Sequence, residues 1–231
     1  MAKFIAFDLG AESGRAILAT LNKGRLHLEE KHRFPNPAGQ ITGHMHWNIL
    51  AQWEELKMGL RKSAAGQRKI DGIGVDTWGV DFGLLDKSGE LLGFPFHYRD
   101  SRTTKAMART FKKVSRREIF HATGIQAMPF NTLFQLAATQ HDQPSLLDVA
   151  DKLLFMPDLF NYLFTGIARN EYSIATTSQM VDTKNRRWAK GLLNKLNLPT
   201  HLLQKLVPSG TVLGDLSKDV VSECGVDKIP V

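Results

Sequence analysis

The sequence predicts an α/β domain with a central mixed β-sheet, and three observations support this fold class. Residues 3–9, KFIAFDL, are almost wholly apolar, which is typical of a strand buried on both faces. Two more strand-like runs, RAILATL and RLHLEEKHRF, follow and are separated by the turn signal Asn22-Lys23-Gly24. A helical repeat and a second buried apolar run come next. We therefore expect three consecutive antiparallel strands, a crossover helix and a further strand.

The crossover helix is predicted within WNILAQWEELKMGLRKSAA. Ile49, Trp53, Leu56 and Leu60 recur there at helical spacing, and Asn48 stands where an N-cap is expected. The next segment, IDGIGVDTWGVDFGLLD, predicts a buried strand, a polar turn and another strand.

From residue 103 onward the pattern turns mostly helical, so we expect a helical insertion in the second half of the domain. Gly and Pro residues separate its segments. The predicted helices lie near residues 103–113, 115–122, 131–140, 156–165, 171–178 and 188–196.

Length and composition fit one large globular domain, since 42% of the 231 residues are hydrophobic and 23% are charged. The single Cys224 cannot form an internal disulfide, and no apolar run approaches the roughly 20 residues of a membrane span. We expect a cytoplasmic protein with no membrane partner. The net charge of +7 is spread over helical segments, and neither a recognition-helix pattern nor regular interleaving of aromatic and basic residues accompanies it, so no nucleic-acid partner is expected.

A turn containing two glycines, GAESGR, follows the first strand. Gly10 and Gly14 would let backbone N–H groups approach a phosphate, and Asp8 at the strand end could hold hydrated Mg²⁺. The P-loop pattern is not met, because a strand follows instead of a helix and Arg15 stands where lysine is expected. The residues fit a β-hairpin phosphate loop or, equally, a plain hairpin turn.

A second polar turn, DTWGVD, ends the other candidate buried strand. Asp76 and Asp81 offer acceptors for hydroxyl groups, Trp78 offers a flat apolar face, and Gly79 allows close approach of a ligand. Adjacent strand ends form the crevice in which α/β proteins bind ligands. This mixture suits a polyol or sugar, and the alternative is a tight turn with Trp78 in the core.

These residues resemble those of the FGGY carbohydrate kinases. FDLGAESGR is similar to the family's N-terminal phosphate loop, in the form found in the member that acts on L-rhamnulose. DTWGVDFGLLD, YRDSRT, GIQAMPFNTLFQL, MPDLFNYLFTG and NEYSIATTSQM then occur in the family's order, along essentially the whole chain. The resemblance implies a ribonuclease H-like (actin-like ATPase) domain with helices flanking its central mixed sheet. It also implies ATP and Mg²⁺ as cofactors and phosphoryl transfer to the primary hydroxyl of L-rhamnulose.

The resemblance implies site residues as well. Asp8 falls on the aspartate associated with the metal, and Gly79 falls on a sugar-contacting position. Asp76, Trp78 and Arg99 lie in or beside the sugar-side strings, whereas Arg102 could instead pair with Asp100 as a structural ion pair. The ATP-contacting turn comprises Ala11, Glu12, Ser13, Gly14 and Arg15.

The family's general base is an aspartate in a Gly/Ser-His-Asp-Thr string, which this chain lacks. The resemblance puts that aspartate just after the strand that begins KIPV, beyond Val231. Residues 1–231 are therefore expected to be the N-terminal, sugar-binding domain, without the C-terminal nucleotide-binding domain, and to be inactive alone. A general base typically contributes about 10² to 10⁴ in rate. Whether the protein is a homo-oligomer is left open.

Three other functions fit the same residues. The substrate could be another ketose of the family's range, such as fuculose, xylulose or ribulose, because a few side chains decide which hydroxyl pattern fits. A nuclease of the same fold would use Asp8, Asp76 and Asp81 to bind two metal ions about 4 Å apart. A non-catalytic module would bind a sugar without hydrolysing ATP.

Two local features complete the set of expectations. His44 and His46 have a spacing that could place two imidazoles on one strand face, but no third metal ligand is evident. Phe130, Asn131 and Thr132 stand before a predicted helix, where they could line the sugar pocket or cap the helix, and capping is the role we favour.

Overall fold

The computed structural model describes residues 1–231 and contains a four-stranded mixed sheet. Its strand order is β3 (Arg25–Pro35), β2 (Ser13–Asn22), β1 (Ala2–Leu9) and β6 (Gly72–Thr77). The first three strands pair antiparallel in sequence order, whereas β6 runs parallel to β1. The predicted mixed sheet is therefore confirmed.

The chain connects β3 to β6 through a short hairpin and one long helix. The hairpin pairs β4 (Ala38–Ile41) with β5 (His44–Trp47), and α1 (Ile49–Ala64) follows directly. Asn48 caps α1 as predicted, because its Oδ1 accepts a hydrogen bond from Ala51 N at 3.2 Å. The helix covers the sheet face that carries Phe7 and Ala16, where it packs so closely that a Cβ on Gly59 would lie 2.7 Å from Ala16 Cβ.

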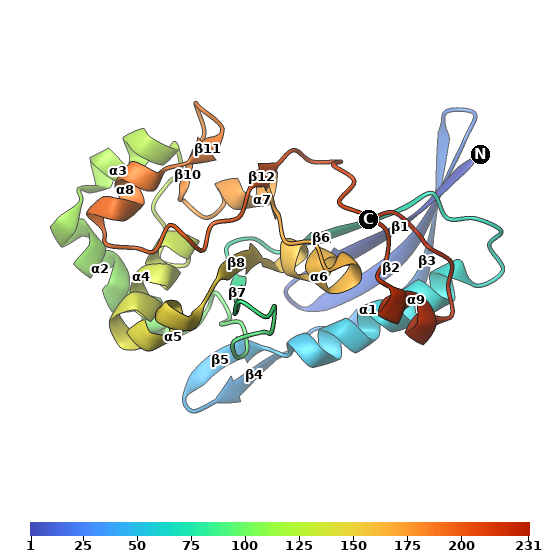
Figure 1. Cartoon of the computed structure of the whole chain (residues 1–231), viewed down its shortest axis with the longest axis horizontal. Coiled ribbons are helices and arrows are strands. Elements are labelled where there is room, and N and C mark those ends of the chain that lie inside the picture. The colour runs from blue at the N-terminus through green and yellow to red at the C-terminus, as the bar shows by residue number, and fades with distance from the viewer.

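The second half is the predicted helical insertion, and Figure 1 shows most of its helices gathered at the end of the molecule away from β1–β3. The strand β7 (Phe82–Leu85), which precedes this half, pairs antiparallel with β8 (Lys152–Phe155), and the two strands lie between the helical layer and the main sheet. The remaining elements are η1 (Ser101–Thr103), α2 (Thr104–Lys113), α3 (Arg116–Thr123), α4 (Thr132–Asp142), α5 (Pro144–Val149), α6 (Met156–Thr165), β9 (Asn170–Glu171), α7 (Tyr172–Thr176), β10 (Val181–Asp182), β11 (Arg187–Trp188), α8 (Lys190–Lys195), β12 (Leu206–Val207) and α9 (Lys218–Cys224).

All six predicted helical segments of this half are present, but α5 and α9 were not predicted. Both are short, six and seven residues, so neither spans enough turns to display an apolar repeat. Local signals did exist: Pro144 opens α5, Ser217 Oγ accepts from Val220 N at the start of α9, and Gly225 ends α9 in the left-handed conformation.

Buried apolar residues form two clusters, one between the sheet, α1 and α6 and the other inside the helical layer. In the first, Phe7 of β1 stacks on Phe164 of α6 with ring centroids 5.6 Å apart, and Trp53 of α1 packs edge-on against Phe164. Cys224 is buried in the same cluster, and burial raises the pKa of its thiol. None of the helices combines the length and the apolar character that crossing a bilayer requires.

Residues 229–231 lie along the outer edge of β6. Ile73 N donates to Pro230 O at 2.8 Å. Val231 N donates to Gly214 O, and Val231 O accepts from Leu213 N, both at 2.8 Å. The KIPV segment thus lies next to the sheet, where it forms an isolated bridge between Pro230 and Asp215 but no strand of its own.

Candidate functional site at adjacent strand ends

The two predicted polar turns are neighbours in space. Asp8 and Asp76 are register partners in the parallel pair β1 and β6, whose strands run about 4.8 Å apart. Beyond the strand ends the pairing continues, since Trp78 N donates to Leu9 O at 3.2 Å. The turn after β1 and the turn after β6 therefore open onto the same edge of the sheet.

A row of charged side chains crosses this edge on one face. Arg33, Arg15, Asp8 and Asp76 are successive register partners in β3, β2, β1 and β6, so they project to the same side. Arg15 pairs with Asp8, with Nη2 and Nε at 2.6 and 2.8 Å from Asp8 Oδ2. Their side chains are 43% and 41% exposed, so a solvent-borne ligand can reach both.

The turn itself is braced from α1. Gly10 N donates to Ser13 O at 2.9 Å, and Asn36 secures the turn by donating from Nδ2 to Gly10 O and from its backbone N to Glu12 O. Buried Gln52 of α1 donates in turn to Asn36 Oδ1 at 2.6 Å. The backbone N–H groups of Ala11 and Glu12 donate to no protein acceptor, so they are free to bind an anion.

Gly14 has a reason for being glycine that the sequence did not reveal. A Cβ at this position would lie 2.2 Å from the buried ring of Phe34, and neither Gly10 nor Gly14 adopts a positive φ. Packing against Phe34, and not backbone freedom for phosphate approach, is what requires a glycine at position 14.

Asp81 was expected to accept from substrate hydroxyls, and the structure contradicts this. Its carboxylate is fully buried, and Oδ2 accepts from Trp47 Nε1 at 2.6 Å, Trp78 Nε1 at 3.0 Å and Tyr98 N at 3.0 Å. Oδ1 accepts from Gln135 Nε2 at 2.7 Å. Burial raises the pKa of Asp81 to about 7, against the effect of these donors. Asp81 organises the core and has no capacity left for a ligand.

Trp78 belongs to a stack of aromatic rings under the turn. Its indole lies 3.8 Å from that of Trp47, centroid to centroid, and His97 stacks on the other side of Trp47 at 4.1 Å. His97 Nδ1 accepts from Arg99 N, and burial lowers the pKa of His97 to about 4, so the imidazole is neutral. Trp78 as a whole is half-buried.

Arg99 and Arg102 have different surroundings. Arg99 is exposed over the ring of Tyr98, with Cζ 5.3 Å from the centroid. The suggestion that Arg102 and Asp100 form an ion pair is wrong. The Arg102 guanidinium donates to Gln135 O, Gln135 Oε1 and Thr139 Oγ1, and Asp100 accepts from the backbone N of Arg102. Burial lowers the pKa of Arg102 to about 10.

The carboxylates do not form a nuclease centre. Asp81 is occupied in the core, and no group of three or more His, Cys, Asp or Glu residues could hold a metal ion by itself. His44 contacts Asp100 at 3.1 Å and His46 contacts Phe94 O, so the two imidazoles do not form a metal site either. Asp8 beside Asp76 fits Mg²⁺, which proteins commonly bind through one or two carboxylates together with substrate phosphates.

Thr177 was not identified from the sequence as a residue of this site, whereas Asn131 and Thr132 stand in the segment considered for the sugar pocket or a helix cap. Asn131 does not cap α4; its Nδ2 donates to Gln126 O and Gln179 Oε1. The next residue, Thr132, and also Thr177 bond to the backbone of Val80. These residues stand in strings that were noticed, GIQAMPFNTLFQL and NEYSIATTSQM, but nothing local to either string indicates that both reach the turn after β6.

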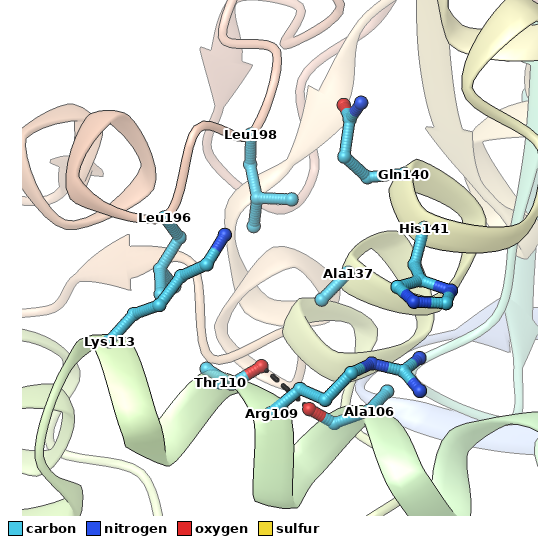
Figure 2. Close-up of a pocket in the computed structure, with 9 residues that line it drawn as sticks. All are labelled: Ala106, Arg109, Thr110, Lys113, Ala137, Gln140, His141, Leu196 and Leu198. Carbon is cyan, nitrogen blue, oxygen red and sulfur yellow. Dashed lines mark hydrogen bonds between the residues drawn. The ribbon is translucent and has the colours of Figure 1, made fainter.

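A separate cavity of about 250 Å³ lies in the helical layer (Figure 2). It lies between α2, α4 and residues 196–198 and is bordered by Arg109 and Lys113, and it shares no residue with the strand-end site.

Sheet order and strand-end carboxylates together define an α/β domain of the actin-like ATPase class, and comparison with solved structures agrees. Gluconate kinase from Lactobacillus acidophilus superposes with a TM-score of 0.86 at 18% identity, covering 99% of this chain and 47% of that one. Xylulose kinase from the same organism superposes with a TM-score of 0.85 at 17% identity, covering 100% and 47%. At these identities the likeness concerns the fold.

Sequence comparison is more specific. Residues 3–231 match the model of the FGGY family of carbohydrate kinases, N-terminal domain, and the chain belongs to this family. A rhamnulokinase from Bacteroides thetaiotaomicron is 43% identical over 99% of this chain, and one from Oceanobacillus iheyensis is 36% identical over 96%. In both cases the match covers 47% of the relative, so the chain spans about half the length of these curated relatives.

Proposed function

We propose that this chain is the N-terminal, sugar-binding domain of an ATP-dependent kinase that phosphorylates the primary hydroxyl of L-rhamnulose. The observation that carries the proposal is the adjacency of two turns at one sheet edge, one suited to phosphates and one to a polyol. The identity of 43% with a rhamnulokinase supports L-rhamnulose over fuculose, xylulose or ribulose as the ketose. Because the reaction consumes ATP, the cytoplasm is the compartment we assign.

On the nucleotide side, we assign the turn Ala11–Arg15 to the ATP phosphates. The free amides of Ala11 and Glu12 and the guanidinium of Arg15 offer positive charge to phosphate oxygens, while Ser13 and Gly14 shape the turn. Asp8, with Asp76 beside it, would hold Mg²⁺, which neutralises phosphate charge during transfer. Phosphoryl transfer depends mainly on such positioning and charge neutralisation.

On the sugar side, we assign Asp76, Trp78, Gly79 and Arg99. Asp76 is exposed, so its carboxylate can accept from substrate hydroxyls. Trp78 supplies an apolar ring face, and Arg99 an exposed cation above Tyr98. In this proposal a polyol would lie beside the phosphate turn, with its primary hydroxyl facing the γ-phosphate.

The general base, in this proposal, belongs to the part of the relatives that this chain does not cover. We therefore expect residues 1–231 to bind ketose but to form ADP only at background rate when incubated with Mg-ATP and L-rhamnulose. Titration calorimetry with L-rhamnulose, L-fuculose, xylulose and ribulose would rank the ketoses. Turnover by the chain alone would contradict the placement of the base, and absence of binding to every ketose would contradict the sugar-site assignment.

A further inference from the structure

The turn after β6 contains a strained backbone conformation at Val80. Its φ is +68°, in the left-handed region that β-branched residues rarely enter. Asp81 N donates to Gly79 O at 2.9 Å, which closes a three-residue ring around Val80. A positive φ at the centre of such a ring is the mark of the γ-turn form that is rare and strained. Strain of this kind persists where the surroundings over-determine it.

Side chains from the helical insertion hold both peptide groups of Val80. Thr177 Oγ1 accepts from Val80 N at 3.1 Å and donates to Ile174 O at 2.7 Å. On the other side, Thr132 Oγ1 donates to Val80 O at 2.6 Å, and Gln135 Nε2 lies 3.3 Å from the same oxygen. Val80 is buried, so water does not supply hydrogen bonds to its peptide groups, and these side chains supply them instead.

One backbone group of the turn has no protein partner. Gly79 N donates to no acceptor, whereas the N–H groups of Trp78, Val80 and Asp81 are all bonded. Gly79 is half-buried and lies against Thr177, whose Oγ1 would be 3.1 Å from a Cβ on Gly79. The free N–H is therefore that of Gly79, and the position of Gly79 depends on Thr177 and on the strained turn.

We propose that Thr177 and Thr132 are positioning residues that hold Val80 in its strained turn, so that Gly79 N–H is fixed as a hydrogen-bond donor to a ketose hydroxyl. The inference rests on the proposed function, because it assigns a purpose to the sugar side of that site. The clamp explains how valine is tolerated at position 80. A turn that is held from both sides keeps one conformation and orients the donor before the sugar binds.

The test uses the full-length kinase and the Thr177→Val variant, which keeps the side-chain shape but removes the hydroxyl. We expect the KM for ketose to rise about 10-fold, in line with the loss of one buried hydrogen bond, while the KM for ATP changes less than 2-fold. Thr132→Val is expected to act in the same direction. Thr177→Ser retains the hydroxyl and should restore the KM to within about 3-fold of the parent value.

The matched control is Thr110→Val in α2. Thr110 is buried whereas Thr177 is half-buried, and the Thr110 hydroxyl donates to Ala106 O within its own helix (Figure 2), away from the strand ends, so Thr110→Val tests the loss of a threonine hydroxyl elsewhere in the fold. A general loss of packing would raise the ketose KM in both valine variants, and this result would overturn the proposal.

A second measurement on residues 1–231 separates failure of the clamp from failure of the sugar assignment. Thr177→Val should lower the urea midpoint of unfolding, and the loss should be at least halved in the Val80→Gly background, because glycine adopts positive φ without strain. Equal losses in the two backgrounds would refute the clamp whatever the substrate is. If the coupling is present but the parent enzyme phosphorylates no ketose, the clamp stands and the proposed function, with the role of Gly79 in it, is wrong.

Discussion

Arg15 Nη2 lies 2.6 Å from Asp8 Oδ2, so the cation assigned to phosphate and the carboxylate assigned to Mg²⁺ neutralise each other in the free protein. Both side chains are partly exposed, and an exposed ion pair contributes little to stability. The pair can therefore separate at low cost when a metal–phosphate complex offers each partner a stronger interaction.

This relationship gives the first prediction. Arg15→Gln and Asp8→Asn should each lower the affinity of residues 1–231 for Mg-ATP at least 5-fold in calorimetry at low salt, and should change the free energy of unfolding by less than about 1 kcal/mol. Arg33→Gln is the matched control, because Arg33 neighbours Arg15 in the sheet but pairs with Glu30. Equal effects of all three substitutions would show that overall charge, and not the turn, attracts the nucleotide.

The second prediction concerns Gly14. Gly14→Ala forces the new methyl against the ring of Phe34 and should destabilise the chain by about 1 to 3 kcal/mol, measured by urea unfolding. The additional Phe34→Leu substitution makes room, so the cost of Gly14→Ala should be smaller in that background. A cost that is the same in both backgrounds would mean that the ring is not the obstacle.

Asp81 gives the third prediction. Asp81→Asn replaces one acceptor oxygen with an NH₂ group that must face a donor, either Gln135 Nε2 or the cluster around Trp47. We expect a loss of about 2 to 3 kcal/mol in unfolding free energy, together with altered tryptophan fluorescence. Asp76→Asn, at an exposed carboxylate, should cost less than about 0.5 kcal/mol. Similar losses for the two variants would contradict the core role of Asp81.

The fourth prediction is a pH dependence that arises from Asp158 in α6. Asp158 is buried and accepts from Asn170 Nδ2 and Glu171 N, and burial raises its pKa to about 7 from an unfolded value near 3.9. Between these values the folded state holds a proton that the unfolded state has released. The stability from Asp158 is therefore complete below about pH 4 and is lost as the pH rises through about 7.

The measurement compares the parent chain with Asp158→Asn across pH 4.5 to 8. The difference in unfolding free energy between them should be most favourable to the parent at the acid end and should shrink toward pH 8. A difference for Asp158→Asn that is constant with pH would show that this carboxyl does not titrate in the range.

Short stretches of the sequence were enough to predict most strands and helices of this protein. Period-two and continuous apolar runs identified β1, β2, β3 and β6, and the helical repeat with Asn48 before it identified α1, because periodicity and caps act between residues a few positions apart. The ends of β1 and β6 could be located in the same way, since each apolar run stops at an aspartate. Their adjacency followed from parallel pairing, and the structure confirms it.

Tertiary structure decides the roles of the side chains in the turn after β6. Asp76 and Asp81 stand five positions apart in one polar string and looked equivalent, yet one is exposed and the other is fully buried. The difference comes from partners far along the chain: Trp47 and Gln135 reach Asp81 across 34 and 54 residues, and Thr177 reaches Val80 across 97. Such contacts leave no periodic signal, because each joins two otherwise unrelated segments that meet after the chain has folded.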